Sequence, residues 1–170
     1  CTIENISNPT LEKLDSIIRR IFLMTKRIIN DFNEDIIKGK LENVGYFKDQ
    51  NIQMNIYSNY CLRMLSNDLK LKSKSYPLWS LILRIKQIFE IIYYCYYKLN
   101  LERKIKKEIV NISNSFQDLY NKIYELFYNY DIHKTKLIHD NYYDINPDYY
   151  KLLLSSKEQD TFILFHLGKA

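Results

Sequence analysis

The feature that most constrains the fold is an apolar seam that repeats at alternating spacings of four and three residues. Its members are Ile105, Ile109, Ile112, Phe116, Leu119, Ile123, Leu126 and Tyr130. A second seam of the same period contains Leu11, Leu14, Ile18, Ile21, Ile28 and Phe32. An apolar stripe with this period becomes buried only when its helix packs against other helices. The sequence therefore predicts an all-α protein, built as an antiparallel bundle or helical array.

The length of the chain, 170 residues, is typical of one domain, which we expect to span residues 1–170. A domain of this size buries roughly two-thirds of its unfolded surface, so its core needs no disulfide or metal. Only three Gly and three Pro are present, which favours long helices. The abundance of Ile, Asn, Lys and Tyr indicates an AT-rich genome. The net charge of +5 is compatible with acidic partners but does not require them.

We expect about four long helices followed by a short C-terminal helix pair. Residues 1–7 are expected to be a flexible N-terminus. Asn8 and Pro9 then form a typical helix start, with Asn as the N-cap and Pro in the first turn. Gly39 is a typical C-terminal stop, so this first helix is expected to end near Lys38.

The middle of the chain predicts two more helices. Residues 40–50 carry little pattern and are expected to form a loop before a second helix that begins near Asn51. Pro77 is expected to open the third helix. Residues 78–101 are apolar almost all round, which is typical of a helix buried on every side or of a membrane span. Within residues 78–101 the longest uncharged run, residues 91–97, is far shorter than the ~20 residues that a bilayer requires, so we expect no membrane span.

The C-terminal part of the chain has a different pattern. The helix of the first seam is expected over residues 102–130, and the mixture of His, Asp, Asn and Tyr at residues 131–146 predicts a loop. Residues 147–170 are expected to form a short helical pair, or the start of further helices. The chain opens with Cys1 and closes inside a helical pattern, which is typical of a processed product or an excised domain. Because the chain closes inside a helical pattern, we expect an excised domain rather than a processed product.

No residues are spaced as a catalytic, metal or nucleotide site requires. The cysteines, Cys1, Cys61 and Cys95, form no CxxC pair, and their odd number favours a reducing, intracellular location, cytoplasmic or nuclear, over secretion. Two Asn-x-Ser sequons count toward secretion. His133 and His139 lie six residues apart, which is not a ligand spacing. We therefore expect no enzyme activity, no cofactor and no bound metal.

Two surfaces are candidates for partner binding. The first is a basic patch beside a run of tyrosines, and it contains Arg84, Lys98, Arg103, Lys104 and Lys107. Basic side chains next to aromatic rings are typical of single-stranded nucleic-acid contact, although a solvated lysine-rich face gives the same pattern. The second is an aromatic stretch with aspartates beside it, made of Tyr142, Tyr143, Tyr149 and Tyr150. These tyrosines are suited to docking a partner or to packing of the loop onto the bundle.

Three motifs in order resemble a known family. Leu78 and Trp79 begin an apolar helix, Phe116-x-x-Leu-Tyr-x-x-Ile123 follows, and Phe162-Ile-Leu-Phe-His-Leu-Gly168 is similar to the start of a TPR-like helix. This order resembles the 14-3-3-like helical domain of the telomerase-associated and nonsense-mediated-decay adaptors, over Tyr76 to Ala170. In that family an Asp and then Leu-Ala-Arg-Tyr follow the last Gly, whereas Lys-Ala follows it here. The family's phosphate-binding residues match no positions of this chain, so none is transferred.

The expected function is recognition by a non-enzymatic adaptor or scaffold module that binds a protein partner. A groove between helices could hold a phosphorylated or acidic segment, with arginines and lysines making charge-assisted contacts. The first alternative is a secreted cytokine-like or effector four-helix bundle that acts on a receptor or host surface. The second is an accessory subunit that contacts nucleic acid.

Overall fold

The computed structural model describes residues 11–42, 44–67, 72–98, 105–155 and 163. Within these ranges the chain forms five long α-helices and no strand. The helices are α1 (Leu11–Lys38), α2 (Val44–Asn67), α3 (Lys72–Lys98), α4 (Lys107–Tyr128) and α5 (Ile132–Ser155). The all-α fold class predicted from the two seams is therefore confirmed.

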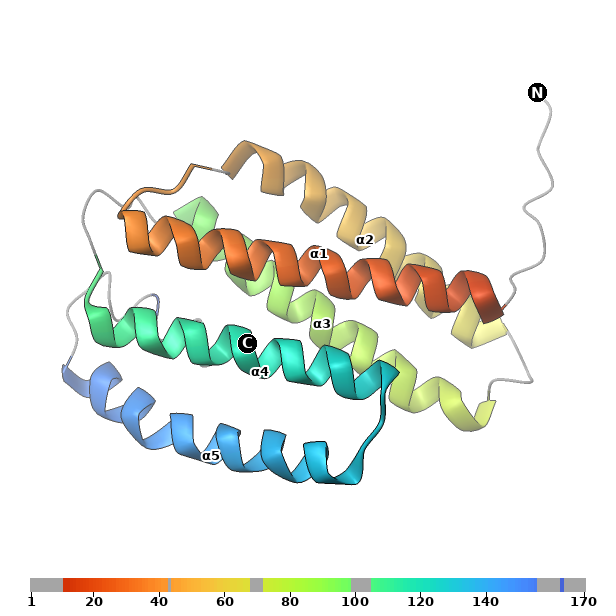
Figure 1. Ribbon diagram of the computed structural model, residues 1–170. Helices are drawn as coiled ribbons and strands as arrows, with labels where there is room; N and C mark the ends of the chain where they lie inside the picture. The colour runs from red at the N-terminus through yellow and green to blue at the C-terminus, as the bar shows by residue number, and fades with distance from the viewer. Residues whose placement is uncertain (1–10, 43, 68–71, 99–104, 156–162, 164–170) are drawn as a thin grey trace.

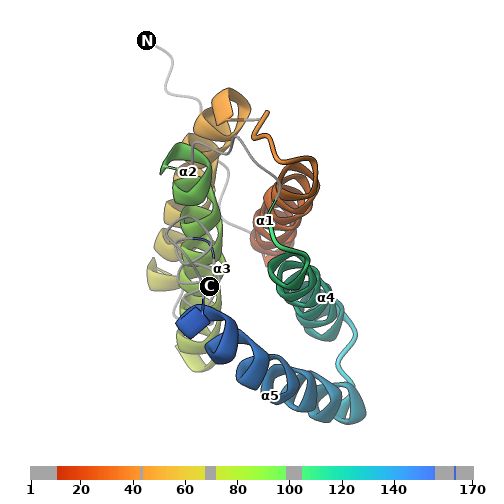
Figure 2. The same ribbon diagram turned by 90° about the vertical axis from the view of Figure 1, so that its left-hand side faces the viewer.

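Each helix runs opposite to the one before it, so the chain passes back and forth along one axis (Figure 1). α1 lies at the centre and packs against α2, α3 and α4. α2 and α3 also pack against each other, and α5 packs along α4. In the turned view, α2 and α3 form one side of the bundle, α1 and α4 form the other, and α5 runs along the lower edge (Figure 2).

The apolar stripe of α1 forms the middle of the core. Five members of the predicted seam are buried, namely Leu14, Ile18, Ile21, Ile28 and Phe32. Phe22, Ile29 and Ile36 are buried as well, so the stripe is wider than a two-position seam. A wide stripe is expected for a helix with three neighbours, because its apolar face must reach all of them. The ring of Phe22 is fully buried and packs against four rings of α4, those of Tyr120, Tyr124, Phe127 and Tyr128.

The first helix ends as the sequence predicts. Gly39 has a φ of 74°, in the left-handed region that favours glycine. The N–H of Lys40 donates to the carbonyl of Asp35 at 3.1 Å, as in a Schellman motif. The Asp35 carboxylate also accepts the N–H of Glu42 at 3.0 Å. Because these bonds reverse the chain within a few residues, α2 begins inside residues 40–50, and the loop predicted there is too long.

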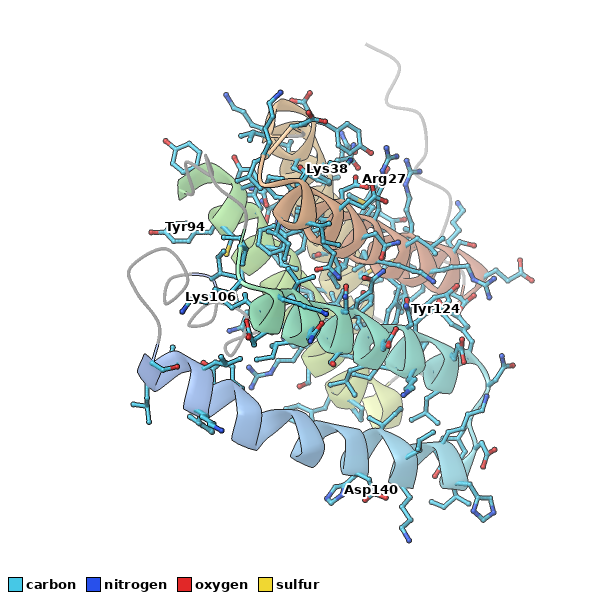
Figure 3. The ribbon with its side chains drawn as sticks, turned by 60° about the vertical axis from the view of Figure 1, so that its left-hand side comes forward. Arg27, Lys38, Tyr94, Lys106, Tyr124 and Asp140 are labelled. Carbon is cyan, nitrogen blue, oxygen red and sulfur yellow. The ribbon has the colours of Figure 1, made fainter. Side chains whose placement is uncertain are left out.

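α3 is buried on one side only, so the prediction of a helix enclosed on every face is wrong. Its inner side is buried at Ile82, Ile85, Phe89, Ile92, Cys95 and Tyr96. On its outer side Trp79, Leu83 and Tyr94 are exposed, and Figure 3 shows Tyr94 pointing away from the bundle. This one-sided burial results from helix packing, because α1 and α2 both cover the inner side of α3.

Pro77 lies inside α3 rather than at its start, because the helix begins at Lys72. A proline lacks the N–H that would bond to the carbonyl four residues earlier. In the second turn of a helix that loss removes a single bond near the end, where the ladder is least complete. The helix therefore extends one turn further toward the N-terminus than the proline predicts.

The first seam belongs to α4, although the helix is shorter than the seam. Ile109, Ile112 and Tyr120 are buried on α4, and Ile105 is buried just before it. Residues 105 and 106 are not helical, so the predicted start at residue 102 is too early. The other members on the helix are half-buried, namely Phe116, Leu119, Ile123 and Leu126. The last member, Tyr130, lies beyond the helix and is 75% exposed.

The loop predicted over residues 131–146 is wrong, because α5 covers all of it except the first residue. Asp131 starts this helix as an N-cap, since its Oδ1 accepts the N–H of His133 at 2.8 Å. Pro147 lies inside α5, so residues 147–155 continue that helix instead of starting a new one. Packing along α4 outweighs the weak helix propensity of the Asp and Asn residues. Residues 156–170 lie outside the described part, except Ile163, which is fully buried.

Candidate functional site

A groove of about 220 Å³ lies between α1 and the start of α2. It is lined by Arg20, Leu23, Met24, Arg27, Tyr46, Phe47 and Gln50. The four residues from α1 follow the spacing i, i+3, i+4 and i+7, which places them on one face of that helix. α2 runs antiparallel beside α1 (Figure 1), and its beginning supplies the other three groove residues.

The first cation of the groove is Arg27, labelled in Figure 3 beside α2. Its guanidinium carbon lies 4.6 Å from the centre of the Tyr46 ring, within the range of a cation–π contact. Its Nε also lies 3.6 Å from Asp31 Oδ2, one helical turn further along α1. Partial burial raises the pKa of Asp31, and the nearby Arg27 opposes that rise. Arg27 is therefore held from two sides, by a ring and by a carboxylate.

The second cation is Arg20, two helical turns before Arg27. Its guanidinium carbon lies 4.7 Å from the centre of the Tyr57 ring on α2. Arg20 is exposed, and in the part of the chain that the structure describes no carboxylate forms an ion pair with it. The ring contact orients the guanidinium and leaves its N–H donors available to an anion.

The floor of the groove is apolar. Phe47 is 1% exposed, and its ring lies 5.0 Å from that of Tyr96 on α3, so the floor belongs to the core. Leu23 is 47% exposed and Tyr46 is 37% exposed, which leaves apolar surface open between the two arginines. Gln50 adds an amide that can donate and accept hydrogen bonds. The groove thus combines two cations, an apolar patch and one neutral polar group.

A third stacked arginine lies on the other side of α1. Arg19 is 4.4 Å from the centre of the Tyr128 ring on α4, and it does not line the groove. Burial raises the pKa of the Tyr128 hydroxyl to about 12. Arg19 has the same chemistry as Arg20 in the neighbouring position, so it serves as a matched control for the groove arginines.

Of the basic patch predicted from the sequence, the structure describes the side chains of Arg84 and Lys107. Arg84 is exposed in the middle of α3, where its Nη1 donates to Gln87 Oε1 at 3.0 Å. Fourteen residues of helix, roughly 21 Å, separate it from Lys98 at the end of α3. Lys107 is exposed at the start of α4. The side chain of Lys98, and Arg103 and Lys104 altogether, lie outside the described part of the chain.

The aromatic stretch lies on a helix instead of a loop. Its four tyrosines occupy α5 positions spaced i, i+1, i+7 and i+8. Tyr149 is half-buried against the core, and its ring lies 5.1 Å from that of Tyr150, which is 56% exposed. The side chains of Tyr142 and Tyr143 lie outside the described part. Tyr149 thus packs onto the bundle, whereas the side chain of Tyr150 is accessible to solvent.

The described thiols and histidines do not line the groove. Cys61 and Cys95 are buried free thiols, and burial raises the pKa of each to about 12, so neither is a thiolate at neutral pH. His133 and His139 are exposed on α5, and His139 Nδ1 lies 3.6 Å from Asp140 Oδ1. Among the described residues no three His, Cys, Asp or Glu side chains gather as metal ligands would. None of the described helices has the length and apolar content for a bilayer crossing.

Sequence reasoning missed the groove, although part of its signal is visible. Arg20 and Arg27 lie seven residues apart on the polar side of the second seam, with Leu23 between them. That spacing identifies one helical face but says nothing about the tyrosines across from it. Comparisons with protein families, with curated proteins and with solved structures found no match to this chain.

Proposed function

We propose that this protein is a non-enzymatic interaction module that docks an acidic segment of a protein partner in the groove between α1 and α2. The observation that carries the proposal is the pair of arginines, Arg20 and Arg27, each stacked on a tyrosine of α2. A guanidinium offers several N–H donors in a fixed plane, which suits carboxylate and phosphate oxygens. Stacking restricts these side chains before binding, so less conformational entropy is lost on forming the complex.

The dimensions of the groove favour a peptide over a small-molecule ligand. Its volume of about 220 Å³ is below the roughly 300–1,000 Å³ of typical small-molecule pockets. A recess of this size holds one or two side chains of a segment that runs across the surface. The adaptor role suggested by the 14-3-3-like resemblance agrees with this function and adds no residue to it.

The proposal is tested with fluorescent peptides of three kinds, acidic, neutral and basic, and with a single-stranded oligonucleotide. Polarisation should rise with the acidic peptides alone, and the affinity should fall as salt is added, because ion pairs at an exposed site are screened. The double variant Arg20→Gln/Arg27→Gln should weaken acidic-peptide binding by about tenfold or more, since each charged hydrogen bond is worth ~1.5–3 kcal/mol.

Two single variants are the controls for that experiment. Arg19→Gln removes a stacked arginine of the same helix outside the groove, and Arg84→Gln removes an exposed arginine of α3. Both should bind acidic peptides as the unchanged protein does. Equal weakening by Arg84→Gln would indicate a general charge effect and reject the groove. Preferential binding of the oligonucleotide would instead support the nucleic-acid alternative.

A further inference from the structure

The spacing of the two arginines defines the segment that the groove accepts. We infer that it binds an extended strand in which two acidic side chains flank an apolar one, in the order acid-x-apolar-x-acid. This inference rests on the proposed function and adds the conformation and the pattern of the ligand.

The distance between the two anion positions follows from the helix geometry. Arg20 and Arg27 are seven residues apart on α1, or about 10.5 Å along its axis. Their ring partners, Tyr46 and Tyr57, are eleven residues apart on α2, or about 16.5 Å. Each guanidinium lies between α1 and its ring on α2. The distance between the two anion positions is therefore between about 10.5 Å and about 16.5 Å. Four residues of a strand span about 13 Å, which falls between these limits.

The side-chain period of a strand agrees with this span. Residues i, i+2 and i+4 of a strand point to the same face, so the two acids and the residue midway between them would all face the groove. The surface midway between the arginines is that of Leu23, which is 47% exposed. An apolar side chain placed there would cover Leu23 and the edge of Tyr46, and it would gain about 25 cal/mol for each Å² removed from water.

An extended segment suits the groove better than a helix. A docked helix needs a long apolar strip for its i, i+3, i+4 and i+7 side chains. On the α1 side of this groove only Leu23 and the half-buried Met24 lie between the two arginines. This apolar patch is too short for the apolar face of a helix. The ion pair between Arg27 and Asp31 is made by Nε, and a guanidinium carries five donors, so donors remain for a ligand carboxylate.

The test compares peptides of one composition and different order. The first peptide contains Glu-Ser-Leu-Ser-Glu, and the second contains the same residues as Glu-Glu-Ser-Leu-Ser, each flanked by Gly and Ser and labelled with fluorescein. A third peptide replaces the Leu of the first by Ser. A fourth is a helix-forming peptide with glutamates at i and i+7 and leucine at i+4. Titration of the full chain should give the first peptide an affinity about tenfold above that of the second, because only the first reaches both arginines.

Two variants locate the contacts within the groove. Arg20→Gln should remove the preference for the first peptide over the second, since only one anion position then remains. Leu23→Ser should weaken the first peptide and leave the third unchanged, and folding should persist because the Leu23 side chain is already half in solvent. Circular dichroism of each variant checks that it is folded. Arg19→Gln should change none of these affinities.

The outcomes separate this inference from the proposed function. Equal affinity for the first and second peptides overturns the spacing, while binding of both still supports acidic recognition. Tighter binding of the helix-forming peptide overturns the extended conformation. Failure of every acidic peptide to bind rejects the inference and the proposed function together.

Discussion

Asn33 of α1 and Ser113 of α4 hydrogen-bond to each other twice across the interface of their helices. Ser113 Oγ donates to Asn33 Oδ1, and Asn33 Nδ2 donates to the Ser113 carbonyl at 3.3 Å. Asn33 Nδ2 also donates to Gln117 Oε1, and Gln117 Nε2 donates to Asn30 Oδ1 at 2.6 Å. Asn33 and Ser113 are buried, at 3% and 1% exposure. Sliding one helix by a turn would leave these buried groups unpaired, so the network sets the register of α1 against α4.

The first prediction concerns this network. Asn33→Ala removes the partner of the Ser113 hydroxyl and of Gln117 Oε1, so the free energy of unfolding should fall by about 1–3 kcal/mol. Urea denaturation measures the change. Asn114→Ala, at an exposed position of α4, should stay within about 0.5 kcal/mol of the unchanged protein. If the two variants are equally stable, the network does not contribute to the stability of the fold.

The second prediction concerns a buried carboxylate at the end of α1. The Tyr96 hydroxyl donates to Asp35 Oδ2 at 3.2 Å, and both residues are 1% exposed. Tyr96→Phe removes this donor and should lower the free energy of unfolding by about 1.5–3 kcal/mol, the usual range for a hydrogen bond to a charged group. Tyr76→Phe, at an 82% exposed position of α3, is the control. Thermal unfolding of the two variants at neutral pH should differ, and coinciding midpoints would contradict the prediction.

The third prediction uses two glycines in different backbone conformations. Gly39 has a φ of 74°, where a Cβ is strained, so Gly39→Ala should destabilise the fold by about 1 kcal/mol. Gly45 lies in the first turn of α2, and a Cβ there meets no atom within 4 Å. Gly45→Ala should therefore stabilise the fold by about 0.4–1 kcal/mol, chiefly by restricting the unfolded chain. Opposite signs in urea denaturation are the expected result, and equal signs would reject the conformational argument.

The fourth prediction is a loss of stability at alkaline pH. Burial raises the pKa of the Cys61 and Cys95 thiols from 9.0 to about 12, and burial together with Asp35 raises that of Tyr96 above its ordinary 10.0. The unfolded chain releases these protons at lower pH than the folded chain does. Stability should therefore be full below about pH 9 and fall as the pH rises toward about 12.

Urea midpoints measured in steps of pH test this expectation. The double variant Cys61→Ala/Cys95→Ala should have a shallower decline between about pH 8.5 and pH 9.5, where unfolded thiols titrate and most unfolded tyrosines are still protonated. A midpoint that stays constant up to about pH 11 would show that these groups keep ordinary pKa values in the fold.

The regular features of the fold could be predicted because each depends on neighbours in sequence. The seams on α1 and α4 and the stop at Gly39 are of this kind. The loop predicted at residues 131–146 failed because the lower helix propensity of Asp and Asn costs only about 0.7 kcal/mol per residue. Packing of α5 along α4 outweighs that cost. For the candidate site, the arginine spacing was visible, but the rings of Tyr46 and Tyr57 were not assignable to it.

The sequence by itself determined that this protein is helical, since apolar side chains at a period near 3.6 residues can be buried together only on one face of a helix. Only the tertiary structure decided which faces remained open. The outer side of α3 carries Trp79, Leu83 and Tyr94, and these apolar side chains are exposed because α1 and α2 cover the other side. The groove arose in the same way. Arg27 meets Tyr46 and Arg20 meets Tyr57 because α2 returns antiparallel along α1, and that pairing depends on packing between segments whose relative position no local pattern encodes.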